Sequence, residues 1–178
     1  GISSVRLLVS TSVAAWIVGR GGRAVTSIRS ESGASVQVAR TGGAWRMVEI
    51  RGSLEARDVA LSLLFDAVQT FPEGCPQEMR LVVPGGTIGD RLLADDAAEL
   101  HELREEPGLD ADIISSTEEG WEPPDGSDHC NLFRLSGDIA SISRVAQRFS
   151  SQFADPSAPA RMPPSTASAT PLLARTPN

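Results

Sequence analysis

The sequence has few of the residues that cross-link a chain or anchor it in a membrane. Only two of its 178 residues are cysteines, Cys75 and Cys130, and neither lies in a CxxC or zinc spacing. A framework of several disulfides is therefore excluded, and a reducing compartment, the nucleus or the cytoplasm, is expected. No stretch approaches the roughly 18 uncharged apolar residues of a membrane span, and no basic and apolar leader is present. We expect a soluble chain without a membrane partner; whether it is a fragment of a longer protein is left open by the sequence.

The sequence also lacks the groupings that carry catalysis or hold metal ions. No nucleophile stands beside a candidate base, and no carboxylate pair falls in a recognisable motif. His101 and His129 have no partner at a zinc spacing, and the acidic residues from Asp90 to Asp112 form no compact loop of oxygen ligands. We expect neither an enzyme nor a bound cofactor or metal.

Charge is divided unevenly along the chain, although the total is -7. Residues 1–72 hold eight Arg and five acidic residues, for a net charge of +3, whereas residues 73–154 hold six Arg and seventeen acidic residues, for -11. All sixteen cations are arginine, which a nucleotide bias of the genome explains as well as function does. Because an acidic surface repels a phosphate backbone, the two segments are expected to have different roles.

The chain contains the same order of elements twice, strand, helix, helix, strand, strand, helix. The periodicity of apolar residues predicts strands near 5–9, 34–38, 46–50, 79–83, 109–114 and 132–135. It predicts helices near 13–18, around Val25 and Ile28, near 54–68 and 87–93, around Leu100 and Leu103, and near 139–149. The predicted fold is α+β, with one unit at residues 4–71 and a second at 78–153, each a three-stranded antiparallel sheet packed on three helices.

Two other segments have the composition of irregular chain. Residues 115–130 are rich in Gly, Pro, Asp and Glu, and are expected to form a mobile connection within the second unit. Residues 154–178 are rich in Pro, Ala, Ser and Thr with few bulky apolar residues, and are expected to form a disordered tail.

A glycine-rich loop, Gly19-Arg20-Gly21-Gly22, separates the first two predicted helices. Glycines that bracket two residues let backbone N–H groups approach an anion without a Cβ in the way. The loop opens a helix, whose N-terminus favours negative charge. A phosphate would fit there, although many tight turns between helices use such glycines for steric reasons alone.

Around this loop the sequence resembles type I KH domains, in the tandem arrangement of poly(C)-binding and Nova-like proteins. The family pattern is an apolar strand, an IIGxxG loop, a helix with I-x-x-I-R-x-x-[ST]-G-A, a strand of alternating aliphatic residues, and a strand ending in I-x-G. This chain has it as Ile17-Val18-Gly19-Arg20-Gly21-Gly22, Val25-Thr26-Ser27-Ile28-Arg29-Ser30-Glu31-Ser32-Gly33-Ala34, Val36-Gln37-Val38 and Arg46-Met47-Val48-Glu49-Ile50-Arg51-Gly52. The resemblance covers residues 4–153 and implies the type I KH fold for both units, with the match strongest in the first.

The resemblance implies binding of single-stranded RNA or DNA, with the loop clamping the backbone and the bases in an aliphatic groove. A pyrimidine-rich strand is one candidate ligand. The implied site consists of the loop and the basic residues beside it, Gly19, Arg20, Gly21, Gly22, Arg23, Arg40 and Arg46, and of the aliphatic walls, Ala14, Ile17, Val18, Val25, Val36 and Val38.

Some of these residues have a second interpretation. Ile17, Val18, Val36 and Val38 could equally belong to the core. Trp16 and Trp45 lie beside the implied groove, where each could stack on a base or pack as a lid.

The second copy lacks the glycine-rich loop. Ala94-Asp95-Asp96-Ala97 aligns with Gly19-Arg20-Gly21-Gly22, and a carboxylate about 4 Å from a phosphate costs on the order of 4 kcal/mol at an effective dielectric near 20. Backbone clamping is therefore not expected there, and Gly86-Thr87-Ile88-Gly89 is interpreted as the entry to a helix. The acidic second unit either supports the first structurally or presents a surface to a protein partner. A whole-chain alternative is a protein-interaction scaffold that binds no nucleic acid.

Overall fold

The computed structural model describes residues 2–40, 43–94, 98–124 and 130–155. Each predicted strand and helix is present, with ends shifted by a few residues. In chain order the elements are β1 (Ser3–Ser10), α1 (Thr11–Val18), a 3-10 turn (Arg20–Gly22), α2 (Arg23–Ser32), β2 (Ser35–Val38), β3 (Trp45–Gly52), α3 (Leu54–Gln69), β4 (Glu78–Val82), α4 (Gly86–Leu93), α5 (Ala98–Arg104), β5 (Leu109–Ser115), β6 (Asn131–Gly137) and α6 (Ile139–Phe153).

The six strands form one antiparallel sheet in the order β2-β3-β1-β4-β6-β5. The prediction of two separate three-stranded sheets is therefore wrong. Each half does contain three strands, but β1 and β4 would be edge strands with unpaired backbone groups. They pair with each other, with Leu7 opposite Leu81 and Leu8 opposite Arg80, and so join the halves.

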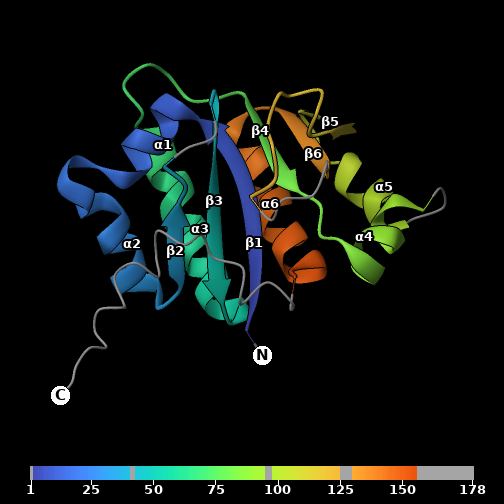
Figure 1. The fold of residues 1–178 in the computed structure, drawn as a ribbon, viewed down its shortest axis with the longest axis horizontal. Helices are drawn as coiled ribbons and strands as arrows, with labels where there is room; N and C mark the ends of the chain where they lie inside the picture. Colours follow the sequence, from blue (N-terminus) through green and yellow to red (C-terminus); the bar gives the residue numbers. More distant parts are fainter. Residues whose placement is uncertain (1, 41–42, 95–97, 125–129, 156–178) are drawn as a thin grey trace.

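The helices cover one face of this sheet, with α1 and α2 at one end and α4 and α5 at the other (Figure 1). The long helices α3 and α6 lie behind the middle of the sheet and contact each other. Alternate residues of β1, namely Val5, Leu7 and Val9, point into this layer of helices. One continuous apolar core, which includes Leu64 of α3 and Phe149 of α6, thus extends across both halves.

The opposite face of the sheet, called the open face below, carries a smaller apolar cluster. It joins Leu8 and Met47 of the first half to Val82 and Trp121 of the second. Trp121 is 4% exposed and lies in the connection that was expected to be mobile. Within the described residues 116–124 of that connection, Trp121 packs on the sheet, because this large apolar side chain has a surface to cover.

Side chains cap the N-termini of both long helices. In α3 the hydroxyl of Ser53 accepts from the Ala56 N–H at 3.2 Å. In α6 the carboxylate of Asp138 accepts from the Ser141 N–H at 2.9 Å and from the Ser141 hydroxyl at 3.0 Å. These hydrogen bonds are the main reason that the pKa of Asp138 is lowered.

Asp138→Ala is expected to lower the free energy of unfolding at neutral pH. Because the folded-state pKa lies below the unfolded value near 3.9, the ionised cap stabilises the fold above about pH 4, and this is lost as pH falls through the folded pKa. The difference between wild type and variant in urea unfolding should therefore be present at pH 7 and shrink at lower pH. A difference that does not change with pH would contradict the assignment.

Some expectations fall at or beyond the limits of the described residues. Ala154 and Asp155 were expected in the tail, but Asp155 forms backbone hydrogen bonds with Ser4 in both directions. The rest of the tail, the aspartates of the Ala94–Ala97 segment, and His129 lie outside the described residues. No helix in the described part of the chain has the length and apolarity needed to cross a membrane.

Candidate nucleic-acid interface

The glycine-rich loop is built from backbone conformations that favour glycine. Gly19, Gly21 and Gly22 have φ angles of 78°, 64° and 80°. A Cβ on Gly19 would lie 2.7 Å from the Cβ of Ala24, so glycine lets α1 and α2 approach each other. Around Gly21 and Gly22 no atom lies within 4 Å of the Cβ position, so the surface of the loop is open.

The loop also leaves the N-terminus of α2 without a side-chain cap, since its N-cap residue is Gly22. The first N–H groups of a helix have no partner within the helix. Together with the helix dipole they favour an anion at this position.

A groove of about 680 Å³ begins at this loop. Its walls are one face of α1, one face of α2, the end of β2 and the residues beside it. The lining residues are Thr11, Ala14, Ala15, Val18, Gly19, Gly21, Gly22, Val25, Thr26, Arg29, Val38, Ala39, Arg40 and Arg46. The structure thus brings nine of the thirteen predicted site residues together around one groove.

The groove is lined by aliphatic side chains and by arginines. Arg29, Arg40 and Arg46 line it, and among the described residues no carboxylate does. The guanidinium of Arg29 donates to the Val36 carbonyl at 2.8 Å, and that of Arg46 to the Gly43 carbonyl at 3.1 Å. These bonds hold two of the three guanidinium groups at the groove. The arrangement suits a ligand with negative charge along one side and flat apolar groups along the other.

Two of the predicted wall residues lie elsewhere. Ile17 and Val36 are 0% exposed and belong to the core. The prediction that these two side chains line the groove is therefore wrong. Val36 and Val38 lie on the same face of β2, but only Val38, the last residue of the strand, reaches the groove.

Arg20 and Arg23 are exposed and line a neighbouring hollow of about 790 Å³, which shares Gly19 with the groove. Trp16 lies in the same hollow. The indole N–H of Trp16 donates to the Ala67 carbonyl at 2.7 Å and its ring contacts Phe71 edge-on.

Trp45 packs on the open face, where the Arg80 guanidinium lies 4.1 Å from its ring centre. Neither tryptophan lines the groove, and Trp45 has the role of a packing residue.

Five residues that line the groove were not predicted from the sequence: Thr11, Ala15, Thr26, Arg29 and Ala39. The helical repeat could have found most of them. Positions 11, 14, 15 and 18 form one face of α1, and positions 22, 25, 26 and 29 form one face of α2.

All residues that line the groove lie within a segment that matches a known protein family. The model of the KH domain family matches residues 4–66. Residues 4–66 form a KH domain. KH domains generally bind single-stranded nucleic acid, and the matched segment contains the whole glycine-rich loop. Among curated proteins, none matches this chain.

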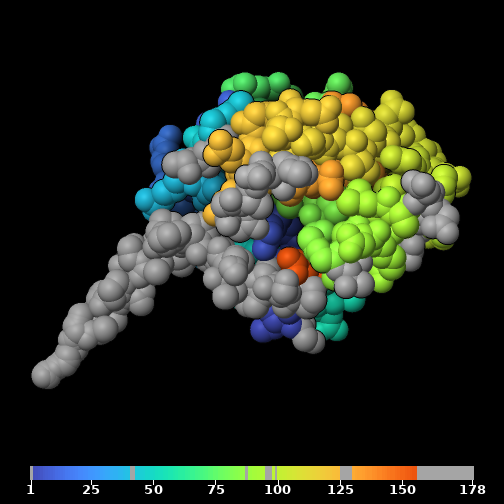
Figure 2. Space-filling view, turned by 45° about the vertical axis from the view of Figure 1, so that its right-hand side comes forward, coloured from blue at the N-terminus to red at the C-terminus, as the bar shows by residue number. Residues whose placement is uncertain are grey.

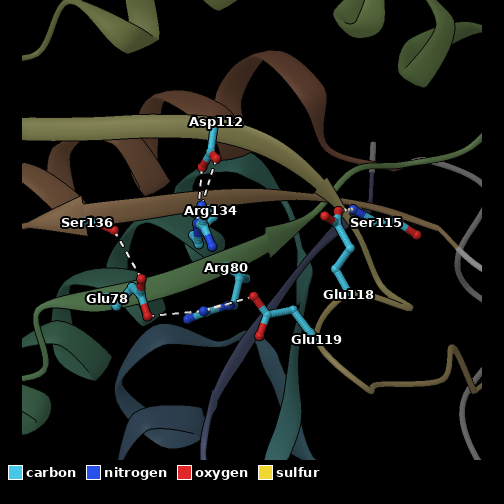
Figure 3. Close-up of polar contacts among 8 residues, drawn as sticks. All are labelled: Glu78, Arg80, Asp112, Ser115, Glu118, Glu119, Arg134 and Ser136. Carbon is cyan, nitrogen blue, oxygen red and sulfur yellow. Dashed lines mark hydrogen bonds and ion pairs between the residues drawn. The ribbon is translucent and has the colours of Figure 1, made fainter.

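Outside the KH domain, the described part of the second half contains four arginines that form ion pairs with described acidic side chains. Figure 3 shows the pairs on the open face, where the Arg134 guanidinium donates twice to Asp112, at 3.1 and 2.8 Å. These hydrogen bonds raise the pKa of Arg134. The other pairs are Arg80 with Glu78 and Glu119, Arg144 with Glu106, and Arg148 with Glu102. Each of these guanidinium groups thus has an acidic partner beside it, whereas no described carboxylate lines the groove of the KH domain.

Proposed function

We propose that the protein binds single-stranded RNA or DNA through its KH domain, with the backbone held at Gly19–Gly22 and bases in the groove. The observation that carries this proposal is one continuous groove that joins the loop to three arginines and to no described carboxylate. Binding by one such unit should be of modest affinity and should weaken as salt rises.

The second half enters the proposal as a divergent KH unit in tandem with the first, as in the poly(C)-binding and Nova-like proteins that the sequence resembles. The element order of the second half, which repeats that of the first half, supports this. An acidic unit with paired arginines is suited to supporting its neighbour through the shared sheet rather than to binding phosphates. We expect the protein to act in the nucleus or the cytoplasm and to have no catalytic activity.

The test is fluorescence anisotropy of a labelled, short C/U-rich RNA and of the same DNA sequence, at low and moderate salt. Arg20→Asp combined with Gly21→Asp is expected to weaken binding at least about tenfold, because it places two carboxylates beside the phosphate position. Aspartate tolerates the left-handed conformation of Gly21 better than most residues, and no atom obstructs its Cβ, so the variant should fold.

The matched control is Arg104→Asp combined with Gly120→Asp. It makes the same exchanges in the second half, at an exposed arginine and at a glycine with φ of 70° and no atom near its Cβ. It should bind as the wild type does. If circular dichroism shows folded protein but neither variant nor wild type binds either strand, the nucleic-acid proposal fails and the scaffold alternative replaces it. Equal losses in the two double variants would instead remove the loop from the site.

A further inference from the structure

A cavity of about 360 Å³ lies on the open face of the sheet, where the two halves meet. Its walls come from Arg6 of β1 and Glu49 of β3, from α4 and the connection before it, and from the segment that begins at Trp121. In Figure 2 the blue surface of the first half shows between the green of α4 and α5 and the yellow and gold of the chain that follows them. The cavity is separate from the KH groove, with which it shares no lining residue.

Glu49 is a buried carboxylate with half of its hydrogen-bonding capacity unused. It is 2% exposed. Its Oε2 accepts from the Arg6 Nε at 3.0 Å, whereas its Oε1 has no hydrogen-bond partner among the described residues. Buried carboxylate oxygens are normally satisfied, because an unpaired one has lost its water without compensation. Glu49 lines the cavity, and a donor that entered it and reached Oε1 would satisfy this buried oxygen.

One face of α4 widens the cavity and adds a second negative charge. Gly86, Gly89, Asp90 and Leu93, spaced by three and four residues, all line it. A side chain at Gly89 would collide with the Pro84 carbonyl oxygen, so glycine lets the helix lie against the connection that precedes it. Asp90 is exposed at the cavity and forms no described ion pair.

Much of the remaining wall is apolar, although Asn131 and Arg6, which is paired with Glu49 Oε2, also line the cavity. Met47, Trp121 and Pro123 line the cavity beside the acidic groups. An aliphatic stem that ends in a cation would match this combination, since arginine buries its methylenes against apolar surface while its planar head donates to carboxylates.

We propose that this cavity binds the side chain of an arginine in a partner peptide. The guanidinium donates to Glu49 Oε1 and is balanced by Asp90, and the methylenes pack against Met47 and Trp121. The net charge of -11 over residues 73–154 attracts a basic peptide and disfavours a ligand that carries phosphate.

The probe is the peptide acetyl-Gly-Pro-Arg-Pro-Gly-amide, titrated into the ¹⁵N-labelled full chain, beside the same peptide with citrulline in place of arginine. Citrulline keeps the shape and removes the charge. The arginine peptide is expected to bind at least about fivefold more tightly and to shift the backbone amides of Gly85–Asp90 and Trp121. Shifts confined to other regions, or equal affinity for the two peptides, would overturn the proposal.

Two variants test the carboxylates. Glu49→Gln and Asp90→Asn should each reduce affinity for the arginine peptide, with a larger loss for Glu49→Gln. Asp110→Asn is the matched control, because it removes the same charge from an exposed position of β5 that does not line the cavity. If Glu49→Gln unfolds the chain, Asp90→Asn at its exposed position still decides, and unchanged affinity in it would count against the site.

A saturating RNA separates this proposal from the preceding one. Peptide binding should persist in its presence and in the Arg20→Asp, Gly21→Asp variant, since neither alters the cavity.

Discussion

Arg57→Met is expected to lower the free energy of unfolding by about 2–4 kcal/mol, because it leaves buried acceptors without a donor. Arg57 lies on α3 and is 4% exposed. Its guanidinium donates to the Ser150 hydroxyl at 2.9 Å, the Ser150 carbonyl at 3.0 Å and the Gly52 carbonyl at 2.8 Å. One side chain therefore ties α3 and the end of β3 to α6, across the boundary between the halves.

Burial has a cost for this arginine, since desolvation lowers the pKa of Arg57 and the nearby Asp58 offsets only part of the effect. Methionine avoids that cost and keeps most of the stem, so the measured loss reports on the three hydrogen bonds. Urea unfolding followed by circular dichroism gives the value. Arg104→Met, at an exposed position of α5, should change stability by less than about 0.5 kcal/mol. Equal stabilities for Arg57→Met and wild type would show that the three hydrogen bonds only offset the cost of burying the guanidinium, so that Arg57 adds nothing to the joint between the halves.

Phe149→Ala is expected to cost about 3–5 kcal/mol, the usual range for removing a buried phenylalanine. Phe149 lies on α6 and is 1% exposed. Its ring centre lies 6.1 Å from that of Phe133 and 5.4 Å from that of Phe153, and such aromatic pairs add to the burial of area. Phe149→Leu fills much of the same space and should cost clearly less.

The same variant tests whether the two halves form one cooperative unit. Because the core is continuous from β1 to α6, the loss should also appear in the first half, as faster hydrogen exchange of the β3 amides under native conditions. Unchanged protection in β3, together with lower protection in β6, would mean that the halves unfold independently.

The joined sheet bears on the proposed function. Strand β1 leads directly into α1 and the glycine-rich loop. One edge of β1 pairs with β3 of the KH domain, and the other edge pairs with β4 of the second half. The second half thus holds the KH domain from the side opposite to the groove. The sequence left two roles open for the second half, structural support of the first half and binding of a protein partner. The strand contacts favour structural support. The proposed arginine-binding cavity would add a contact with a protein partner.

The sequence by itself determined the elements, the repeat and the loop. Local rules carry these features: apolar residues at helical spacing in α3, alternation in β2, and glycines at positive φ in the loop at Gly19–Gly22. Most of the groove follows from them, because Val18, Val25 and Val38 are placed by the periodicity of their own elements.

Only the tertiary structure decided which surfaces meet. The pairing of β1 with β4 needs two edges that are about 70 residues apart in the chain, and no local pattern specifies a partner for an exposed strand edge. For the same reason Ile17 and Val36 could not be separated from the groove residues: all are aliphatic, and packing alone decides which face is covered. Trp121 lies in no motif and Glu49 stands at a variable position of the strand motif, and their roles arise because the open face brings distant segments of the chain together.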